Sequence, residues 1–225
     1  MFTLLCSSMV KSLDSLTTII TTTTSRSNSS SSIVKERSST TESSSSYPES
    51  EISSSHWCIL AYWELKSRVG RLFPVSNERI DIFNDCPKGN GLYLGYFPLH
   101  HIDHNSGKIG KTRAKIGNGI RIIRKGSSVY VYNRSDYPIF LNSATLCPPN
   151  SRRPTIFKIL PGYSIKAFDY DVALKNTLYP FRSEKDGPID LYSIRISFVK
   201  GWGPNYSRQT ITSCPCWLEV LFMHR

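Results

Sequence analysis

Short apolar runs separated by turn residues make up the chain from residue 57 onward. The first of them, Trp57–Trp63, is apolar at consecutive positions, which indicates a central strand buried on both faces. Ile120–Ile123 and Val129–Tyr132 flank Lys125-Gly126-Ser127-Ser128, a sequence that predicts a β-hairpin. Residues 194–198 alternate between apolar and polar, as in a strand with one buried face. Further apolar runs occur at Val69–Val75, Leu92–Tyr96, Pro138–Leu141, Thr155–Leu160, Ser164–Phe168 and Trp217–Phe222. About ten short strands with turns between them predict a β-sandwich.

Two stretches lack the alternation of a strand and are predicted to be helical. Asn105–Lys115 has room for about three turns, and Gly117 and Gly119 are placed to end the helix. Asp169–Leu178 is the second helical segment, and Tyr179–Gly187 after it contains Pro and Gly and is predicted to be a loop. The expected architecture is therefore mainly β, with a few short helices and long loops.

The first 56 residues differ in composition from the rest, because they contain 20 Ser and 9 Thr in runs such as Ser43–Ser46. A segment this poor in apolar side chains cannot offset its ordering entropy by burial. We therefore predict a disordered tail over 1–56 and one folded domain over 57–225. No Lys or Arg precedes the mildly apolar stretch Phe2–Val10, and no run of about 18 apolar residues occurs. We expect no secretory signal, no membrane insertion, and a location in the cytoplasm and nucleus.

The net positive charge lies in the predicted folded domain. The tail carries 4 basic and 5 acidic residues, whereas residues 57–225 carry 24 basic and 12 acidic ones. Acidic residues are absent between Asp103 and Asp136 and again from Leu191 to Leu218. The basic residues of these two spans are Lys108, Lys111, Arg113, Lys115, Arg121, Arg124, Lys125, Arg134, Arg195, Lys200 and Arg208. Two such spans favour an anionic partner, either nucleic acid or a phosphorylated protein. The sequence has no helix-turn-helix, zinc-finger or RNP aromatic pattern that would specify nucleic acid.

Catalytic and metal-binding constellations are not evident in the sequence. Cys214-Pro215-Cys216 is the only close cysteine pair, and a structural zinc site usually takes two such pairs, so we expect reduced thiols in or near the core. His100, His101 and His104 are expected in a surface loop rather than in a metal site. No Ser/His/acid or Cys/His signature and no phosphate-cradling glycine loop stands out. We expect neither an enzyme nor a bound cofactor or metal.

Several motifs, in the right order, resemble the C-terminal Mad-homology domain of SMAD proteins. Val199–Thr210 (VKGWGPNYSRQT) closely resembles the SMAD L3 loop, and Ser213–Val220 follows it as in that family. The other matching segments are Trp57–Leu65, Lys115–Ile120 and Pro161–Lys166. The resemblance covers residues 57–225 and implies a SMAD/FHA-like β-sandwich.

Within that family the chain is most similar to the inhibitory members. Receptor-activated SMADs end in a Ser-x-Ser motif after a final helix, whereas this chain stops at Phe222-Met223-His224-Arg225, directly after the last predicted strand. Cys214–Glu219 and Tyr132–Phe140 also look like inhibitory SMADs. Residues 1–56 are too short and too polar for the DNA-binding N-terminal Mad-homology domain.

The resemblance implies stoichiometric inhibition of TGF-β/BMP-family signalling rather than catalysis. Inhibitory SMADs bind activated type I receptor kinases through a basic groove and block receptor-activated SMADs. The positions that match this groove are Lys111, Lys115, Lys200 and Arg208, all within the two acid-free spans. The L3-loop residues expected to contribute are Gly201, Trp202, Gly203, Tyr206 and Gln209.

Three questions stay open at the level of sequence. Trp202 between two glycines is either an anchor in the partner or a plug in the core. Vertebrate members recruit ubiquitin ligases through Pro-Pro-x-Tyr, a motif that neither Tyr47-Pro48 nor Pro148-Pro149 completes. The basic faces also fit DNA binding, and the family resemblance also fits sequestration of receptor-activated SMADs by hetero-oligomerisation.

Overall fold

The computed structural model describes residues 10–11, 56–85, 89, 91–97, 106–148, 155–179 and 190–224. Most of the tail predicted over 1–56 lies outside these residues. So do His100, His101 and His104, and nearly all of the loop predicted over 179–187. Within the described part of the chain, no helix is long and apolar enough to cross a membrane.

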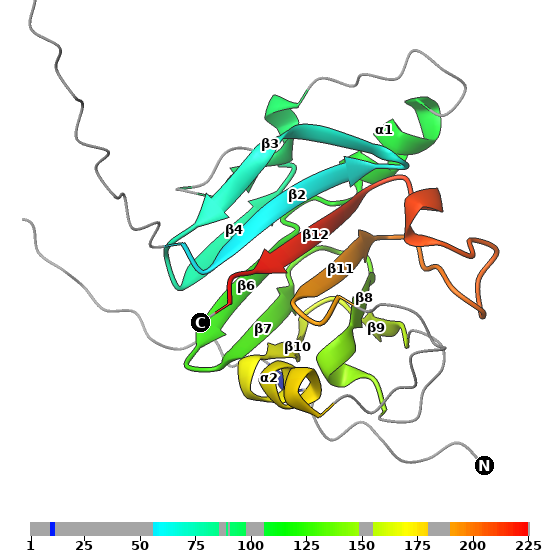
Figure 1. The fold of residues 1–225 in the computed structure, drawn as a ribbon. Coiled ribbons are helices and arrows are strands. Elements are labelled where there is room, and N and C mark those ends of the chain that lie inside the picture. The colour runs from blue at the N-terminus through cyan, green and yellow to red at the C-terminus, as the bar shows by residue number, and fades with distance from the viewer. Residues whose placement is uncertain are drawn as a thin grey trace, which may run out of the picture. The chain divides into compact units, whose positions relative to one another are not determined.

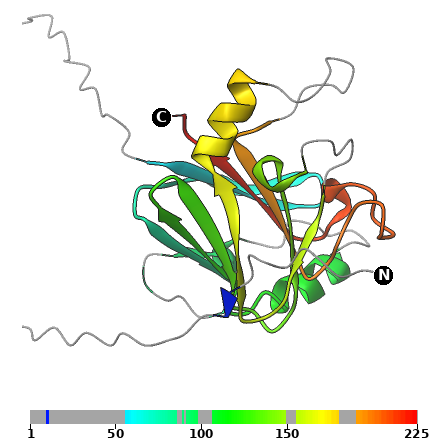
Figure 2. The same cartoon turned by 90° about the horizontal axis from the view of Figure 1, so that it is seen from below.

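Two six-stranded sheets pack face to face as a β-sandwich (Figure 1, Figure 2), which confirms the predicted fold class. Sheet A contains, in spatial order, β1 (Val10–Lys11), β10 (Tyr163–Asp169), β7 (Ser128–Asn133), β6 (Ile120–Lys125), β4 (Arg79–Phe83) and β5 (Leu92–Tyr93). Sheet B contains β3 (Ser67–Val75), β2 (Cys58–Glu64), β12 (Trp217–Phe222), β11 (Ser193–Phe198), β8 (Ile139–Ser143) and β9 (Phe157–Ile159). The β4–β5 pair is parallel and the other pairs are antiparallel.

Most of the predicted strands are present. The strand β1 was not predicted and lies within the segment predicted to be a disordered tail, and three further details differ. The strand β4 was not predicted, although its isoleucines alternate with charged residues. The run Leu92–Tyr96 is a strand only over β5 and continues as the 3-10 turn η1 (Leu94–Tyr96). The strand β11 is not half-buried as predicted, because Ser193 and Ser197 are buried together with its apolar residues. The loop after β11 folds back over this strand, and the Ser197 hydroxyl donates to the Lys200 carbonyl at 2.6 Å.

Both predicted helices form. α1 (Ser106–Ala114) ends before Gly117 and Gly119, which have φ values of 53° and 63°. A Cβ at Gly119 would lie 1.9 Å from the carbonyl oxygen of Ile82, so only glycine lets the chain pass this close to β4. α2 (Tyr170–Leu178) begins at Asp169, whose carboxylate accepts backbone N–H bonds from the first turn at 3.0 and 3.2 Å.

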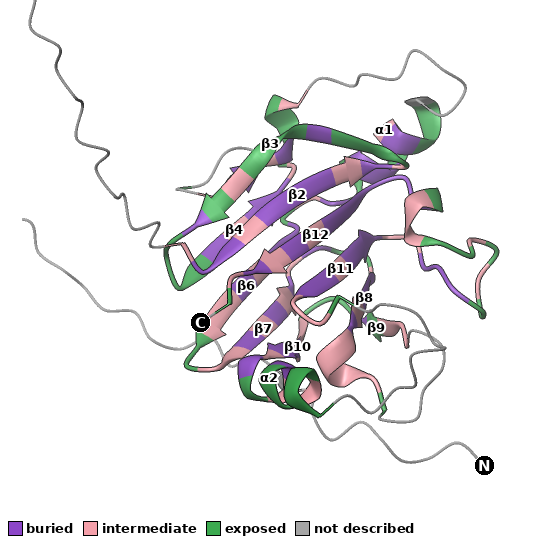
Figure 3. Cartoon of the chain, in the orientation of Figure 1, coloured by how far each residue is buried: buried purple, intermediate pink, exposed green. Residues whose placement is uncertain are grey.

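One large apolar cluster fills the space between the sheets. It includes Leu60 and Tyr62 of β2, Ile122 of β6, Val131 of β7 and Val220 of β12, all of them at most 1% exposed. Figure 3 shows β2, β12 and β11 mostly in the colour of buried residues. The consecutive apolar positions of Trp57–Trp63 are thus explained by a strand inside sheet B, as predicted.

Candidate functional site

The loop between β11 and β12, here called the β11–β12 loop (199–216), begins with an uncommon backbone turn. Val199 has a φ of 66°, and the Lys200 N–H donates to the Phe198 carbonyl at 2.7 Å across it, which is a γ-turn. The Val199 N–H in turn donates to the Pro138 carbonyl at 3.1 Å. A β-branched residue with positive φ is a strained arrangement that the surrounding structure must hold. The direction in which Lys200 leaves the sheet is therefore fixed by the backbone.

Trp202 is a plug in the core rather than an exposed anchor. It is 5% exposed and packs in a second apolar cluster with Phe140, Cys214 and Trp217. Trp63 stacks on Trp217 at a centroid distance of 5.1 Å at the rim of this cluster. The packing of this cluster attaches the β11–β12 loop to sheet B.

The remaining loop residues predicted from the L3 resemblance shape the loop or lie on its surface. A Cβ at Gly201 would lie 2.5 Å from the ring of Tyr206, so the glycine lets this ring close over the backbone. Gly203, with a φ of 94°, donates its N–H to the Arg208 carbonyl at 2.7 Å. Gln209 is exposed, and its amide donates to the Tyr206 carbonyl at 3.1 Å. The side chain of Arg208 is left half-exposed at the edge of the loop.

The helix α1 presents lysines outward and one arginine inward. Lys108, Lys111 and Lys115 are exposed, although Lys115 lies in the turn just after the helix rather than on its last turn. Arg113 is 5% exposed, and its guanidinium lies 3.4 Å from the carboxylate of Glu64, which is 0% exposed. The same guanidinium donates to the carbonyls of Leu94 and Phe97 and to the Asn84 side chain. Sequence reasoning counted Arg113 as surface charge, and it also missed Glu64, whose position in an otherwise apolar strand was the available signal.

One direct contact links α1 to the β11–β12 loop, and the turn after α1 is linked to the same loop through residues 137–138. The Lys115 ammonium lies 5.0 Å from the ring centroid of Tyr137, and the next residue, Pro138, is the one that receives the Val199 N–H. The thiol of Cys216, at the end of the loop, contacts the Ile109 carbonyl at 3.8 Å. The structure therefore brings α1 and the β11–β12 loop to the same end of the sandwich (Figure 1). Tyr137 was not among the predicted site residues.

Internal ion pairs account for several cations of the two acid-free spans. Asp81 accepts from Arg121 at 2.7 Å and from Arg134 at 2.9 Å. Arg195 pairs with Glu219 on the adjacent strand at 3.2 Å. Among the described residues, no carboxylate pairs with Lys108, Lys111, Lys115, Lys200 or Arg208. Within the two acid-free spans, the cations at this end of the sandwich that have no described carboxylate partner therefore belong to α1, the turn after it and the β11–β12 loop.

The pairing of Asp81 makes a pH-dependent contribution to stability. Partial burial alone would raise its pKa, but the hydrogen bond and charge of Arg121, with Arg134 and Arg79 nearby, lower the pKa below the usual 3.8. A carboxyl whose folded-state pKa is lowered stabilises the fold above its unfolded pKa, and this stabilisation is lost as pH falls through the folded pKa. We expect Asp81→Asn to lower the free energy of unfolding by about 1 kcal/mol at pH 7 and by progressively less below about pH 4. Urea unfolding of the wild type and of Asp81→Asn from pH 7 to pH 3 measures this difference. If the difference in the free energy of unfolding between the two proteins is the same at every pH, the prediction is contradicted.

Cys214 and Cys216, the two cysteines of the Cys-Pro-Cys segment, are buried and protonated thiols. Burial raises the pKa of Cys216 to about 12, and burial also raises the pKa of Cys214. Both side chains are 0% exposed, as expected for thiols in the core. Thiols of this kind are poor nucleophiles, so the Cys-Pro-Cys segment at the end of the β11–β12 loop contributes buried packing and not a reactive group.

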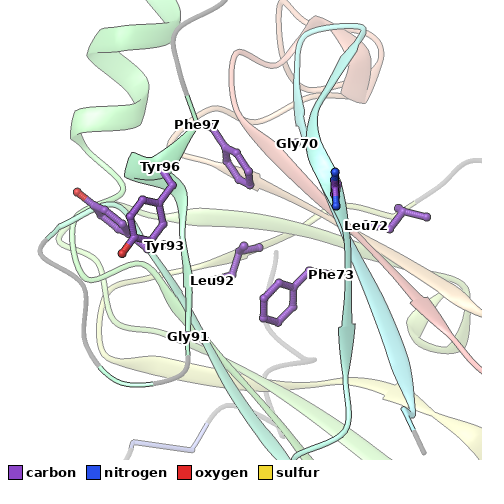
Figure 4. A pocket seen from close by; sticks show the side chains of 9 residues that line it. Gly70, Leu72, Phe73, Gly91, Leu92, Tyr93, Tyr96 and Phe97 are labelled. Atoms are coloured by element: carbon purple, nitrogen blue, oxygen red, sulfur yellow. The ribbon is translucent and has the colours of Figure 1, made fainter. Parts of the chain in front are cut away.

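An apolar pocket of about 420 Å³ lies between β3 and the β5–η1 segment (Figure 4). The rings of Phe73, Tyr93, Tyr96 and Phe97 and the side chain of Leu92 line it, together with residues 70–72 of β3. Phe97 also stacks on Tyr62 at 5.9 Å, and its carbonyl accepts from Arg113. Phe97 thus contributes both to the lining of the pocket and to the hydrogen bonds of Arg113, the buried arginine of α1.

Comparison with known proteins identifies the domain. The MH2 domain family matches residues 55–223. Mothers against decapentaplegic homolog 6 of Gallus gallus is 51% identical over 173 residues, which are 76% of this chain and 39% of that protein. Mothers against decapentaplegic homolog 7 of Homo sapiens is 50% identical over 171 residues, again 76% of this chain and 39% of that protein. The chain thus spans well under half the length of these relatives.

Solved structures with little sequence similarity share the fold. The crystal structure of the interferon regulatory factor 9 IAD domain has a TM-score of 0.50 at 14% identity, and the match covers 76% of this chain and 84% of that chain. A chain of the crystal structure of STAT2 in complex with IRF9 has a TM-score of 0.51 at 12% identity, and the match covers 76% of this chain and 93% of that chain. At these identities the likeness concerns the sandwich alone.

Proposed function

Because the chain belongs to the MH2 domain family, the family of SMAD C-terminal domains, and is similar to its inhibitory members, we propose that it antagonises TGF-β/BMP-family signalling. In this proposal it binds activated type I receptor kinases through a basic groove made of Lys111, Lys115, Lys200 and Arg208. Occupation of the receptor would block access of receptor-activated SMADs. The inhibition is stoichiometric competition without catalysis, and it takes place in the cytoplasm and nucleus.

The observation that carries the proposal is the group of uncompensated cations at one end of the sandwich. Arg113, Arg121, Arg134 and Arg195 of the acid-free spans are paired within the domain. The four groove residues have no carboxylate partner among the described side chains, and neither do Lys108, Arg124 and Lys125 of the same spans. The groove residues lie on α1, the turn after it and the β11–β12 loop, and α1 contacts this loop through Ile109 and Cys216. A phosphorylated segment, with about −1.5 to −2 charges per phosphate, is complementary to such a surface.

Electrostatics and shape have separate tasks in this mechanism. Exposed ion pairs contribute about 0–1 kcal/mol each and are screened beyond roughly 8 Å at physiological salt. The four cations are therefore expected to determine the class of partner and the rate of association more than the affinity. Selectivity is expected from the shape of the β11–β12 loop, which the γ-turn at Val199 and the buried Trp202 hold in one conformation.

Reversing two groove charges is expected to weaken receptor binding at least about tenfold, because like charges would then face the phosphorylated segment. The test is surface plasmon resonance of the full chain against a type I receptor cytoplasmic domain, phosphorylated and unphosphorylated. Wild type and Lys111→Glu/Lys115→Glu are compared. We expect binding that depends on phosphorylation in the wild type and is weakened at least about tenfold in the variant.

The matched control reverses two exposed charges at the far end of β4 and β6, Arg79→Glu/Lys125→Glu, and is expected to leave receptor binding unchanged. Equal binding by all three proteins would contradict a role for the groove. Absence of receptor binding together with binding to a receptor-activated SMAD would favour sequestration instead.

A further inference from the structure

The outer face of sheet A is a second basic surface, separate from the end of the sandwich that carries the groove. Side chains alternate along β6 and β7, so that Ile122 and Val131 enter the core while their neighbours point away from it. Within the described residues neither α1 nor α2 lies over this face (Figure 2). Its outward side chains are correspondingly exposed or only partly buried.

Two tyrosines stand at the centre of this face. Tyr130 and Tyr132 are both on β7, which lies between β10 and β6, and both are partly exposed. Residues two apart on a strand are about 7 Å apart on the same face. The two rings are therefore neighbours on the outward side of β7.

Cations surround the two rings. The register places Tyr132 opposite Arg121 of β6, and places Tyr130 opposite Lys166 of β10. The Lys125 ammonium lies 6.0 Å from the Tyr130 ring centroid, and Arg79 follows on β4. The charged groups of this face are Arg79, Arg121, Lys125, Arg134 and Lys166 against the carboxylates of Asp81 and Asp169, with the carboxylate of Asp171 also close enough to act on Lys166. The face is therefore net positive even after its internal ion pairs are taken into account.

We propose that the outer face of sheet A binds single-stranded nucleic acid by stacking bases on Tyr130 and Tyr132. An open sheet with aromatic rings on a central strand can stack successive bases, and surrounding Lys and Arg can neutralise the phosphates. A duplex keeps its base faces stacked internally and would use only the cations. An acidic peptide would likewise use the cations without needing the two rings, which is why the rings decide between these partners.

The test is fluorescence anisotropy of the full chain with a fluorescein-labelled 12-nucleotide oligo-uridine RNA and the corresponding oligo-thymidine DNA. Tyr130→Ala/Tyr132→Ala is expected to weaken binding at least about tenfold, because stacking on two rings is lost. Tyr130→Phe/Tyr132→Phe keeps both ring faces and is expected to bind within about threefold of the wild type. Binding of the wild type is expected to fall steeply as KCl is raised.

The groove variant Lys111→Glu/Lys115→Glu separates the two surfaces. If it retains binding while the alanine variant loses it, the sheet face is the site. Loss of binding in the groove variant, with no effect of the tyrosine changes, would overturn the proposal and move the contact to the groove. Absence of binding to both oligonucleotides at 50 mM KCl, or equal weakening of the alanine and phenylalanine variants, would also overturn it. Circular dichroism melting confirms that each variant is folded. If polyglutamate displaces the oligonucleotide equally well from the wild type and from the alanine variant, the ligand is held by charge alone and the proposal is overturned.

Discussion

Replacing Arg113 with Met is expected to lower the free energy of unfolding by about 3–5 kcal/mol, because it leaves a charge buried without its partner. Glu64 is 0% exposed, and its Oε2 has no hydrogen-bond partner among the described residues. Its Oε1 accepts from Arg113 at 3.4 Å and from the Tyr62 hydroxyl at 3.1 Å. Without the guanidinium, the Leu94 and Phe97 carbonyls would also lose a donor. Urea unfolding followed by tryptophan fluorescence measures the difference.

The neighbouring Lys111→Met change is the matched control, since Lys111 is on the same helix but exposed, and it is expected to shift stability by no more than about 0.5 kcal/mol. Adding Glu64→Gln to Arg113→Met removes the stranded charge and is expected to restore part of the loss. An Arg113→Met protein within about 1 kcal/mol of the wild type would refute the assignment. It would mean that the carboxyl of Glu64 is accommodated in another way.

Replacing Trp202 with Ala is expected to cost about 3–5 kcal/mol, the range for deleting a large buried aromatic side chain. Trp202 fills the cluster with Phe140, Cys214 and Trp217, so its removal opens a cavity under the β11–β12 loop. Because this cluster attaches the loop to sheet B, the position of Lys200 is expected to become variable. Thermal unfolding measures the stability, and receptor binding of the fraction that remains folded measures the effect on the loop.

The exposed residue Asn205 provides the control within the same loop. Asn205→Ala is expected to leave stability within about 0.5 kcal/mol of the wild type. If Trp202 were an anchor in the partner, its substitution would reduce binding and leave unfolding unchanged. That outcome would contradict the burial of the indole.

The sequence predicted the elements whose signals are local. The turn at Lys125–Ser128 was predicted because glycine allows the positive φ that a tight hairpin needs, and Gly126 has a φ of 59°. Both helices were predicted from the loss of strand alternation, and Gly117 and Gly119 were expected to end the first of them. The burial of β11 was predicted incorrectly, because the cover over Ser197 comes from a loop that the strand pattern does not describe.

The candidate site was predicted in part, and the limits are clearest for two residues of one helix. Lys111 and Arg113 are both cations in α1 and are two positions apart, yet one is exposed and the other is buried. The difference depends on Glu64, 49 residues earlier in the chain, which contacts Arg113 from the strand β2 of sheet B. Local spacing carries no information about such a partner.

The sequence by itself determined the mainly β fold, the two helices, the location of the net positive charge in residues 57–225, and the family to which the domain belongs. These follow from periodicity, composition and motif order, which are properties of neighbouring residues. Only the tertiary structure decided which cations are neutralised, that Trp202 is buried, and that Tyr130 and Tyr132 share an open face with basic side chains. Ion pairing and burial depend on the distance between residues far apart in sequence, and that distance is set when the two sheets pack together.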